Sequence, residues 1–545
     1  MSEGNKISSC SPDEFGQDRV FAFLQDASTH GGVEVRRIDT HAASVFLAGD
    51  TAYKVKRNVR FPFLDYSSLD KRYAACQSEL DVNRQFAPAL YRRVVPITRE
   101  RNGALRLNGH GEPVEWAVEM ARFDEGLTLD HLADKGALDS ALCQKIARVV
   151  VEMHERAIPA DSTAWLAAIE LYVGQNTKAF EECGNIFDPQ RVKELDKRSR
   201  AELVRLHSLL ESRAAKNFVR RGHGDLHLGN LALVDGEPVA FDAIEFDAVI
   251  ASGDVLYDLA FLLMDLVERN LVELSNIVLN EYFKAARRDC DLDGIAALPL
   301  FMSLRAAIRS KVTAARLARA EQANRQTIAA AAVRYFHLAC ELLQPTAPAI
   351  ICTAGLSGTG KSVLARSLAP ALPPLPGALI LRSDVERKTM IGLLETQRLP
   401  PESYGPEASA KLYALLQQKA DRIVRAGHSV IVDAVFAKND ERAAIERVAW
   451  DAGARFLGLF LTAPLQVRIK RVGSRLNDAS DADAAVVRQQ DLYELGEMNW
   501  TLLDASGSPT EILAKARQLI VASLNKAPAQ PLPANRRNED PKARD

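Results

Sequence analysis

The sequence lacks the features that mark secreted, disulfide-stabilised or membrane-spanning proteins. Its 7 cysteines are scattered and form no C-x-x-C pair, a usage typical of a reducing compartment rather than of a disulfide framework or a zinc module. The first residues have neither the basic start nor the apolar stretch of a signal peptide. No apolar run approaches the roughly 18 residues that a membrane span requires. We therefore expect a cytoplasmic protein without a membrane partner.

The sequence also lacks an excess of either charge and is poor in aromatic residues. It has 69 Lys+Arg against 71 Asp+Glu, a formal net charge of −2 and 6% aromatic residues. Nucleic-acid-binding proteins usually show a basic excess with interleaved aromatics, so a nucleic-acid partner is disfavoured. The hydrophobic content of 47% and the charged content of 26% are ordinary for globular proteins. A length of 545 residues allows about two to four domains at roughly 150 residues each.

Local composition divides the chain into two halves of different architecture. The segment QPTAP, residues 344–348, separates a helical pattern from an apolar strand pattern and is interpreted as a linker. The half before it, residues 26–343, opens with strands and ends with helices. The half after it, residues 349–525, alternates strand and helix. Residues 1–25 are interpreted as a flexible N-terminus, and the Pro- and charge-rich residues 526–545 as a disordered tail.

A glycine-rich phosphate-binding sequence follows the linker. The strand pattern at 349–353 leads into GLSGTGKS at 355–362, which is G-x-x-x-x-G-K-[ST] with a helix pattern after it. The glycines let backbone N–H groups surround phosphate oxygens, and the helix N-terminus adds positive charge. We expect Lys361 to contact the β- and γ-phosphates and the Ser362 hydroxyl to hold Mg²⁺. The residues expected to bind ATP are Gly355, Ser357, Gly358, Thr359, Gly360, Lys361 and Ser362.

Two further strand patterns in this half end near aspartates. Residues 378–381 lead to Asp384, and residues 429–432 lead to Asp433. Ligands gather at the carboxyl ends of parallel strands, so we expect Asp433 to position Mg²⁺. Asp384 is expected to receive the proton of an acceptor hydroxyl, with Arg387 one turn later to orient the acceptor. Alternatively, Asp384 caps a helix, a role that does not exclude the first.

Three arginines follow the last long strand pattern. Arg468, Arg471 and Arg475 are spaced for one helix face, which indicates a basic segment that closes over the phosphates; a solvated basic face is the alternative. This half resembles the P-loop small-molecule kinases, in the neighbourhood of gluconate kinase, adenylylsulfate kinase and the polynucleotide 5′-hydroxyl kinases. The resemblance implies an α/β fold with a parallel sheet, a base role for Asp384, and phosphate contacts from Arg471 and Arg475.

The first half carries a different kinase signature, HGDLHLGN at 223–230. Asp225 and Asn230 have the spacing of the kinase catalytic loop, and Asp242 follows an apolar strand pattern. In this pattern Asp225 accepts the proton of the substrate hydroxyl, while Asn230 and Asp242 hold Mg²⁺. A transition-metal site is the alternative, but the oxygen-rich set favours Mg²⁺.

A kinase of this type also requires a lysine on an upstream strand and a glutamate on a helix. Residues 44–47 and 51–56 form an expected hairpin, on which Lys54 and Lys56 alternate onto one face. Ala52-Tyr53-Lys54 is similar to the A-x-K of V-A-I-K, so we favour Lys54, with Lys56 as the alternative. Glu79, in a helical pattern, is the expected partner.

This half resembles the aminoglycoside phosphotransferase and choline kinase superfamily through HGDLHLGN, Asp242 and the motif Gly253-Asp254-x-x-x-Asp258-Leu-Ala260. The resemblance implies an α+β protein-kinase-like fold, ATP and Mg²⁺ as cofactors, and scaffold roles for Asp254 and Asp258. One departure from protein kinases is that no glycine-rich loop precedes the lysine strand. The whole chain resembles the fused bacterial proteins labelled bifunctional aminoglycoside phosphotransferase/ATP-binding protein.

The two halves together predict a bifunctional ATP-dependent phosphotransferase. We expect two independent Mg-ATP sites, each transferring the γ-phosphoryl group to a hydroxyl of a small molecule, without an obligate protein partner. Two alternatives stay open: one kinase domain regulated by a second ATP-binding or ATP-hydrolysing domain, and a protein similar to a nucleic-acid 5′-hydroxyl kinase. The balanced charge disfavours the last of these.

Overall fold

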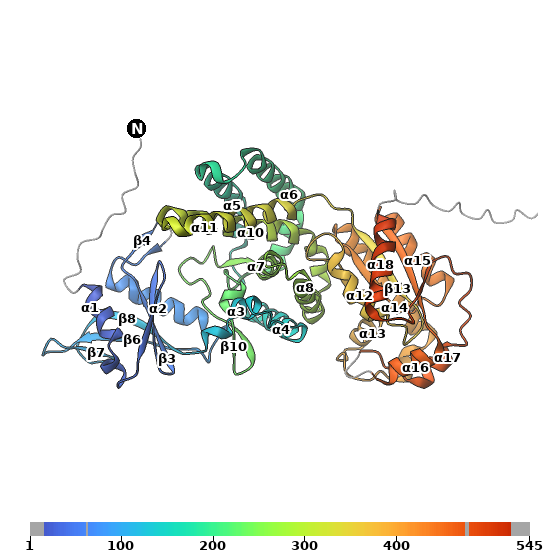
Figure 1. Ribbon diagram of the computed structural model, residues 1–545, viewed down its shortest axis with the longest axis horizontal. Helices are drawn as coiled ribbons and strands as arrows, with labels where there is room; N and C mark the ends of the chain where they lie inside the picture. The colour runs from blue at the N-terminus through green and yellow to red at the C-terminus, as the bar shows by residue number, and fades with distance from the viewer. Residues whose placement is uncertain (1–15, 62–63, 475–478, 525–545) are drawn as a thin grey trace, which may run out of the picture. The chain divides into compact units, whose positions relative to one another are not determined.

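The computed structural model describes residues 16–61, 64–474 and 479–524, and the chain divides into two compact units (Figure 1). Unit 1 comprises the chain up to residue 270 together with 284–286 and 300–341. Unit 2 comprises 271–283, 287–299 and the chain from 342 onward. Over the described ranges, every helix is too short or too polar to cross a bilayer.

Unit 1 opens with a six-stranded antiparallel sheet in the order β1-β2-β3-β8-β6-β7. Alternating side chains give this sheet two apolar faces. Helix α1 (Gln17–Gln25) packs Phe21 and Leu24 on one face, and α2 (Leu69–Asn83) packs Leu80 on the other. The strands are β1 (Val35–Asp39), β2 (Ala43–Ala48), β3 (Thr51–Lys56), β6 (Tyr91–Arg99), β7 (Leu105–Leu107) and β8 (Glu112–Ala121).

The end of the expected flexible N-terminus is helical. Residues 17–25 form α1, whose Val20, Phe21 and Leu24 are buried against the sheet. The spacing of these three apolar residues puts them on one helix face, and their burial outweighs the polar composition of the first residues. Residues 1–15 and the tail expected at 526–545 lie outside the described residues.

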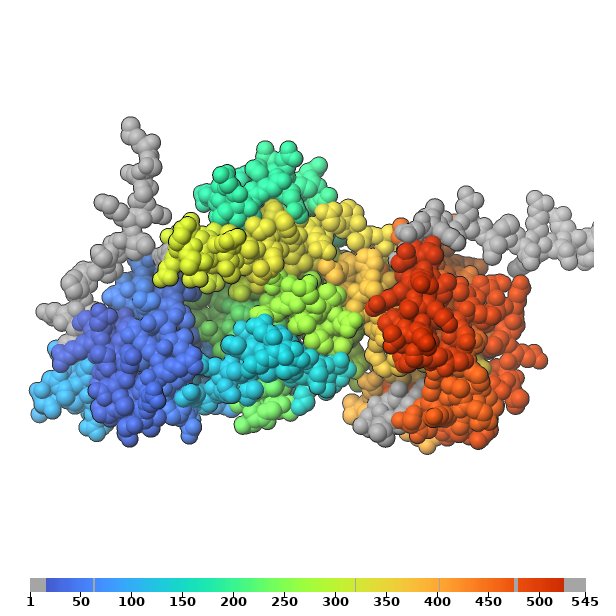
Figure 2. All heavy atoms as spheres, in the orientation of Figure 1, coloured from blue at the N-terminus to red at the C-terminus, as the bar shows by residue number. Residues whose placement is uncertain are grey.

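The rest of unit 1 is mainly helical. Its long helix α11 packs Phe336 against Phe180 and Phe187, with ring centroids 5.1 and 5.0 Å apart, and Figure 2 shows α11 in yellow beside the teal α5 and α6. Two short antiparallel pairs occupy residues 219–254: β10 (Leu231–Val234) pairs with β11 (Glu237–Ala240), and β9 (Val219–Arg221) pairs with β12 (Ser252–Asp254). The helices are α3 (Leu129–Asp134), α4 (Ser140–Arg156), α5 (Ser162–Glu182), α6 (Pro189–Ala215), α7 (Val255–Glu268), α10 (Leu298–Ala315) and α11 (Gln322–Leu342).

Unit 2 contains a five-stranded parallel sheet in the order β14-β15-β13-β16-β17. Helices α12 (Lys361–Leu368) and α18 (Pro509–Leu524) share a core with this sheet, and α14 (Pro406–Arg425) and α15 (Asn439–Asp451) contact its strands as well. The strands are β13 (Ala349–Ala354), β14 (Leu379–Arg382), β15 (Val430–Asp433), β16 (Arg455–Thr462) and β17 (Thr501–Asp504). The expected α/β fold with a parallel sheet is confirmed.

Two helices that precede the expected linker belong to unit 2. Residues 271–283 and 287–299 cluster with unit 2, and they carry α8 (Val272–Ala286) and α9 (Asp289–Gly294). The chain therefore enters unit 2 well before residues 344–348. A single boundary at that linker does not describe the division, because side chains of α8 and α9 bond to the parallel-sheet unit.

His428 joins the starts of two strands in unit 2. It lies buried before β15, and its Nε2 is 2.8 Å from the carbonyl oxygen of Gly377, just before β14. Its Nδ1 is buried without a hydrogen-bond partner among the described atoms. Burial of the imidazole lowers the pKa of His428 to about 4. The folded unit therefore holds this histidine neutral.

We expect the free energy of unfolding of unit 2 to fall by about 2 kcal/mol between pH 7.5 and pH 5 because of His428. The unfolded chain binds a proton on this side chain below about pH 6.5, whereas the folded unit does so only near the lowered pKa, so acid favours the unfolded state. Urea unfolding at both pH values, followed by hydrogen exchange of unit 2 peptides, measures the difference. His428→Gln should remove most of it; a variant with the full wild-type pH dependence would contradict the assignment.

Candidate active sites

Unit 1 contains a cluster of two lysines and three carboxylates, in which Lys56 and Glu79 are buried. Lys54 and Lys56 lie on the same face of β3, toward α2, where one glutamate serves both. The Nζ of Lys54 is 2.7 Å from Oε1 of Glu79, and the Nζ of Lys56 is 2.6 Å from its Oε2. Lys56 also pairs with Glu245. The expected lysine–glutamate pair is thus present in the structure for both candidate lysines.

The two lysines differ in their second partner. Lys54 reaches Asp242, with 2.5 Å between Nζ and Oδ1, whereas Lys56 reaches Glu245, which also accepts a hydrogen bond from the Tyr66 hydroxyl at 3.0 Å. Burial alone would lower the pKa of Lys54, but the carboxylates of Asp242 and Glu79 outweigh it and raise that pKa well above its ordinary value. Both ammonium groups therefore stay charged.

The loop at 223–230 places its polar side chains around Asp225. The amide Nδ2 of Asn230 donates to the backbone oxygen and to Oδ2 of Asp225, both at 3.0 Å. His227 lies 3.4 Å from the same Oδ2. Burial would raise the pKa of Asp225, but His227 and then Arg309 lower it below its usual range. Asp225 is therefore an ionised carboxylate held by its own loop.

Asp242 follows the hairpin of β10 (Leu231–Val234) and β11 (Glu237–Ala240), which turns at Asp235-Gly236 as expected. Its backbone is left-handed, with φ of 61°, and its N–H donates to the Tyr91 hydroxyl at 3.1 Å. Burial would raise the pKa of Asp242, but Lys54 lowers it. This ionised carboxylate and the Oδ1 of Asn230 are oxygen donors of the type that Mg²⁺ prefers, so the residues fit the expected metal.

A cavity of about 580 Å³ connects this cluster with an apolar region. Lys54, Asp225 and Asp242 line its polar part. Its apolar part is lined by Ile38, Val45, Leu47, Ala52, Met120, Phe123 and Phe241. Phe123 follows the end of β8 by two residues. The cavity therefore brings Lys54 and two carboxylates together with an apolar pocket.

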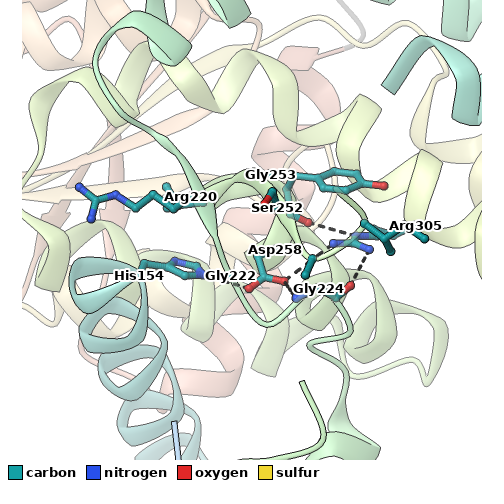
Figure 3. A pocket seen from close by; sticks show the side chains of 12 residues that line it. His154, Arg220, Gly222, Gly224, Ser252, Gly253, Asp258 and Arg305 are labelled. Carbon is teal, nitrogen blue, oxygen red and sulfur yellow. Dashed lines mark hydrogen bonds and ion pairs between the residues drawn. The ribbon is translucent and has the colours of Figure 1, made fainter. Parts of the chain in front are cut away.

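Behind the loop, the buried Asp258 holds its backbone. Asp258 accepts hydrogen bonds from the N–H groups of His223 at 2.9 Å and of Gly224 at 3.0 Å. On the other side, Arg305 donates to the Gly224 carbonyl at 2.9 Å (Figure 3). Asp254 is paired with Arg213 at 2.6 Å. These contacts agree with the scaffold roles that the resemblance implied.

In unit 2 the P-loop lies between β13 and α12. Gly355 has a φ of 131°, and a Cβ there would lie 2.4 Å from the Leu461 carbonyl oxygen. Gly358 has a φ of 86°, and a Cβ there would lie 2.5 Å from the Arg468 carbonyl oxygen. These close approaches require glycine. The Ser362 hydroxyl donates to Oδ2 of Asp433 at 2.5 Å. The side chains expected to hold Mg²⁺ therefore meet at the end of β15.

The fit to a cation is supported by the surroundings of Asp433. Burial raises the pKa of Asp433, and the positive charges of Lys361 and Arg382 oppose that effect. The Nε of Arg382 lies 3.7 Å from Oδ2 of Asp433. A hydroxyl and a buried carboxylate at the mouth of a phosphate loop are the donors used for Mg²⁺ beside a nucleotide.

Asp384 and Arg387 lie on α13 (Ser383–Met390), directly after β14. The negative charge of Asp384 raises the pKa of Asp433, so the two carboxylates are neighbours. Arg387 turns elsewhere: its Nη1 donates to the Ser403 carbonyl at 2.5 Å, and its guanidinium lies 5.1 Å from the Tyr404 ring centroid. Asp384 thus lies on the expected side of the site, while Arg387 is bound to the neighbouring segment.

The three arginines of the expected basic segment differ in environment. Arg471, on α16 (Leu465–Gly473), donates to the carbonyls of Thr359 at 3.4 Å and Gly507 at 3.2 Å. Arg468 is buried and pairs with Asp491. Arg475 lies outside the described residues. Arg471 therefore contacts the P-loop, whereas Arg468 supports the packing beneath it, where its carbonyl approaches Gly358.

Sequence reasoning missed one residue that contacts the P-loop directly. Gln490, at the end of α17 (Ala484–Gln490), accepts a hydrogen bond from the Ser357 N–H at 2.7 Å. It is separated from that serine by 133 positions, and no motif surrounds it. Glu245 was missed as well, although its position three residues after Asp242 offered a local signal.

Comparisons with known proteins agree with these two sites. Residues 35–292 match the family model described as phosphotransferase enzyme family, and residues 350–493 match the model described as AAA domain. An uncharacterized protein of Mycobacterium tuberculosis is 27% identical over 462 residues, which is 83% of this chain and 88% of that protein.

Several solved structures are similar to one half of the chain each. A choline/ethanolamine kinase family protein from Mesorhizobium loti matches 60% of this chain and 98% of its own, at 14% identity and a TM-score of 0.36. The APS kinase CysC of Mycobacterium tuberculosis, solved with AMPPNP and APS, matches 33% and 99% at 23% identity and a TM-score of 0.26. A gluconokinase from Sinorhizobium meliloti matches 33% and 97% at 19% identity and a TM-score of 0.25.

The family matches coincide with the two geometries described above. The match to the phosphotransferase model includes Lys54, Asp225 and Asp242 around the cavity of unit 1, and the match to the AAA model includes the P-loop and Asp433 of unit 2. The chain therefore contains a region similar to the phosphotransferase enzyme family followed by a region similar to the AAA domain, and it is an ATP-dependent phosphotransferase.

Proposed function

We propose that the protein is bifunctional, with two independent Mg-ATP sites that each transfer the γ-phosphoryl group to a hydroxyl of a small molecule. One observation carries this proposal: in each unit the aspartate expected to bind Mg²⁺ contacts a second residue of the expected nucleotide site. In unit 1 this contact is Lys54–Asp242, and in unit 2 it is Ser362–Asp433, both at 2.5 Å. A domain that had lost its chemistry would have no reason to keep such a contact.

In unit 1, the chain's own groups bind, orient and take up a proton. Lys54 holds the phosphates while Glu79 fixes its ammonium group. Asn230 orients the carboxylate of Asp225, which accepts the proton of the acceptor hydroxyl at one of its Oδ atoms. The acceptor oxygen then forms the new bond to the γ-phosphorus as the bond to the β-phosphate oxygen breaks and ADP leaves. Mg²⁺ bound by Asn230 and Asp242 would neutralise charge on the phosphates.

In unit 2, the backbone of 355–362 surrounds the phosphates and Lys361 contacts the β- and γ-groups. Ser362 and Asp433 are the residues that would hold Mg²⁺. Asp384 accepts the proton of the second acceptor, and Arg471 brings positive charge to the P-loop from α16. Arg387 contributes by fixing α13 to the Ser403 segment rather than by touching the acceptor.

We also propose that the acceptors are small molecules and that the protein acts in the cytoplasm without an obligate protein partner. The six cysteines in the described part of the chain form no disulfide, which suits a reducing compartment. A titration with oligonucleotides tests the nucleic-acid alternative, since such binding would weaken steeply as salt rises.

A metabolite extract incubated with γ-labelled ATP tests the bifunctional reading. Wild type should yield two classes of labelled product, one lost in Asp225→Ala and the other lost in Lys361→Ala. If Lys361→Ala abolishes both classes, the P-loop unit regulates unit 1 instead. If ATP is hydrolysed and no metabolite is labelled by either site, the proposal is wrong.

The geometry also distinguishes the two lysines of unit 1. We expect Lys54→Met to lower the transfer rate of unit 1 by about 10²- to 10³-fold and Lys56→Met by less than about tenfold, because only Lys54 contacts Asp242. Single-turnover transfer in a Lys361→Ala background measures both. Thermal unfolding checks that each variant folds, since an unpaired buried Glu79 is destabilising, and Lys56→Arg serves as the conservative control. Equal losses from the two Met variants would contradict the distinction.

A further inference from the structure

The edge of the parallel sheet in unit 2 is closed by side chains instead of by a further strand. β14 is an edge strand of this sheet and pairs with β15 on one side only. On its other side Asn280 of α8 contacts it twice. Its Nδ2 donates to the Ala378 carbonyl at 3.1 Å, and its Oδ1 accepts from the Ile380 N–H at 2.8 Å.

This pair of bonds reproduces what a neighbouring strand would do. A carboxamide has the same donor and acceptor groups as a peptide unit. The carbonyl and the N–H that bond to Asn280 belong to the residues on either side of Leu379, which is the spacing found in a β-ladder. Asn276, one turn earlier and buried, adds a second donor to the Ala378 carbonyl at 3.1 Å. Backbone groups left unpaired in this buried position would cost about 1–3 kcal/mol each.

Charged side chains hold the helix that follows β14. Lys419 of α14 lies 2.8 Å from Glu386 on α13 and 3.5 Å from Asp289 on α9. Arg422 of α14 makes two bonds to Asp293, at 2.8 and 2.9 Å. Glu386 stands between Asp384 and Arg387 in sequence. The α8–α9 segment, residues 271–299, is thus bonded directly to β14 and to α14. Helix α14 is in turn bonded to α13, the helix that carries the expected acceptor residues.

We propose that the α8–α9 segment is a positioning element of the P-loop site, and that Asn276 and Asn280 are its positioning residues. They fix β14, which holds Arg382 near Asp433 and leads into Asp384. A displacement of about 1 Å at a reacting group costs about 10²-fold in rate, so a loosened β14 affects transfer more than nucleotide binding. The inference rests on the proposed role of Asp384 in unit 2.

Hydrogen–deuterium exchange of the full chain tests the placement. Asn280→Ala should raise exchange over residues 379–390 at least tenfold and leave β13 and β16 unchanged. Asn280→Asp keeps an acceptor for the Ile380 N–H and should restore most of the protection there. The control is Glu273→Ala, on the exposed side of the same helix. Wild-type exchange over 379–390 in Asn280→Ala would overturn the proposal.

Phosphoryl transfer in the labelled-ATP extract tests the consequence, in an Asp225→Ala background that silences unit 1. Asn280→Ala should lower kcat for the Lys361-dependent product at least tenfold while KM for ATP stays within twofold. A wild-type kcat would overturn the positioning role. Asp384→Ala separates the two proposals: if it leaves the product unchanged, the proposed role of Asp384 fails, and the exchange result still decides whether α8 fixes β14.

Discussion

Asp225→Ala is expected to lower phosphoryl transfer by unit 1 about 10³-fold, within the range for loss of a general base. The carboxylate lines the cavity with Lys54 and Asp242 and is ionised because His227 and Arg309 lower its pKa against the effect of burial. Alanine leaves no group there to accept the acceptor's proton. Single-turnover transfer from γ-labelled ATP, in a Lys361→Ala background, measures the loss.

The binding of ATP should change little in Asp225→Ala, because the lysine contacts and the apolar pocket remain. Mg-ATP affinity, measured by calorimetry, is expected to stay within about threefold, which corresponds to less than ~0.7 kcal/mol. Glu237→Gln serves as the control and should transfer at the wild-type rate. Glu237 is an exposed carboxylate on β11, in the hairpin that follows the Asp225 loop. A loss below tenfold in Asp225→Ala would remove this residue from the base role.

Lys361→Ala is expected to lower transfer by unit 2 about 10²- to 10³-fold, the usual loss for a charge that stabilises the transferred group. In the described structure Lys361 begins α12, and its Nζ lies 3.2 Å from the Leu356 carbonyl, so it already curls over the loop that would surround the phosphates. The measurement is formation of the labelled product in an Asp225→Ala background.

Independence of the two sites predicts that Lys361→Ala leaves unit 1 transfer unchanged. Lys411→Ala, which removes an exposed lysine of α14, is the matched control. A parallel loss of the Asp225-dependent product in Lys361→Ala would contradict independence and support regulation of one unit by the other.

Local motifs in the sequence were enough to predict most of the fold and the central residues expected in both sites. The P-loop, the β10–β11 turn and the alternation of Lys54 and Lys56 depend on residues close in sequence, where spacing determines geometry. The hairpin pattern could not choose between the lysines, because both point to α2. To distinguish the lysines one must know which carboxylate each ammonium group contacts. These carboxylates, Asp242 and Glu245, lie almost 190 positions after the lysines in the sequence.

The residues that sequence reasoning missed act through contacts that leave no periodic signal. Gln490 reaches the P-loop from α17, and Asn280 reaches β14 from α8, each through one amide side chain. The α8–α9 segment has an ordinary amphipathic pattern, so its membership of unit 2 could not be read from composition. Arg468 is the opposite case. It lies on the same helix as Arg471, as their spacing predicted, but it is buried and pairs with Asp491 instead of contacting the P-loop with its side chain.

The sharing of Glu79 between two lysines restricts how unit 1 can be switched. Its side chain is fully buried, and each carboxylate oxygen holds a different ammonium group. An outward displacement of α2 would take the buried Glu79 away from both ammonium groups, while Lys54 and Lys56 would keep Asp242 and Glu245. Breaking one buried pair already costs about 3–5 kcal/mol. The shared carboxylate therefore ties α2 to β3 and opposes control of unit 1 by movement of this helix.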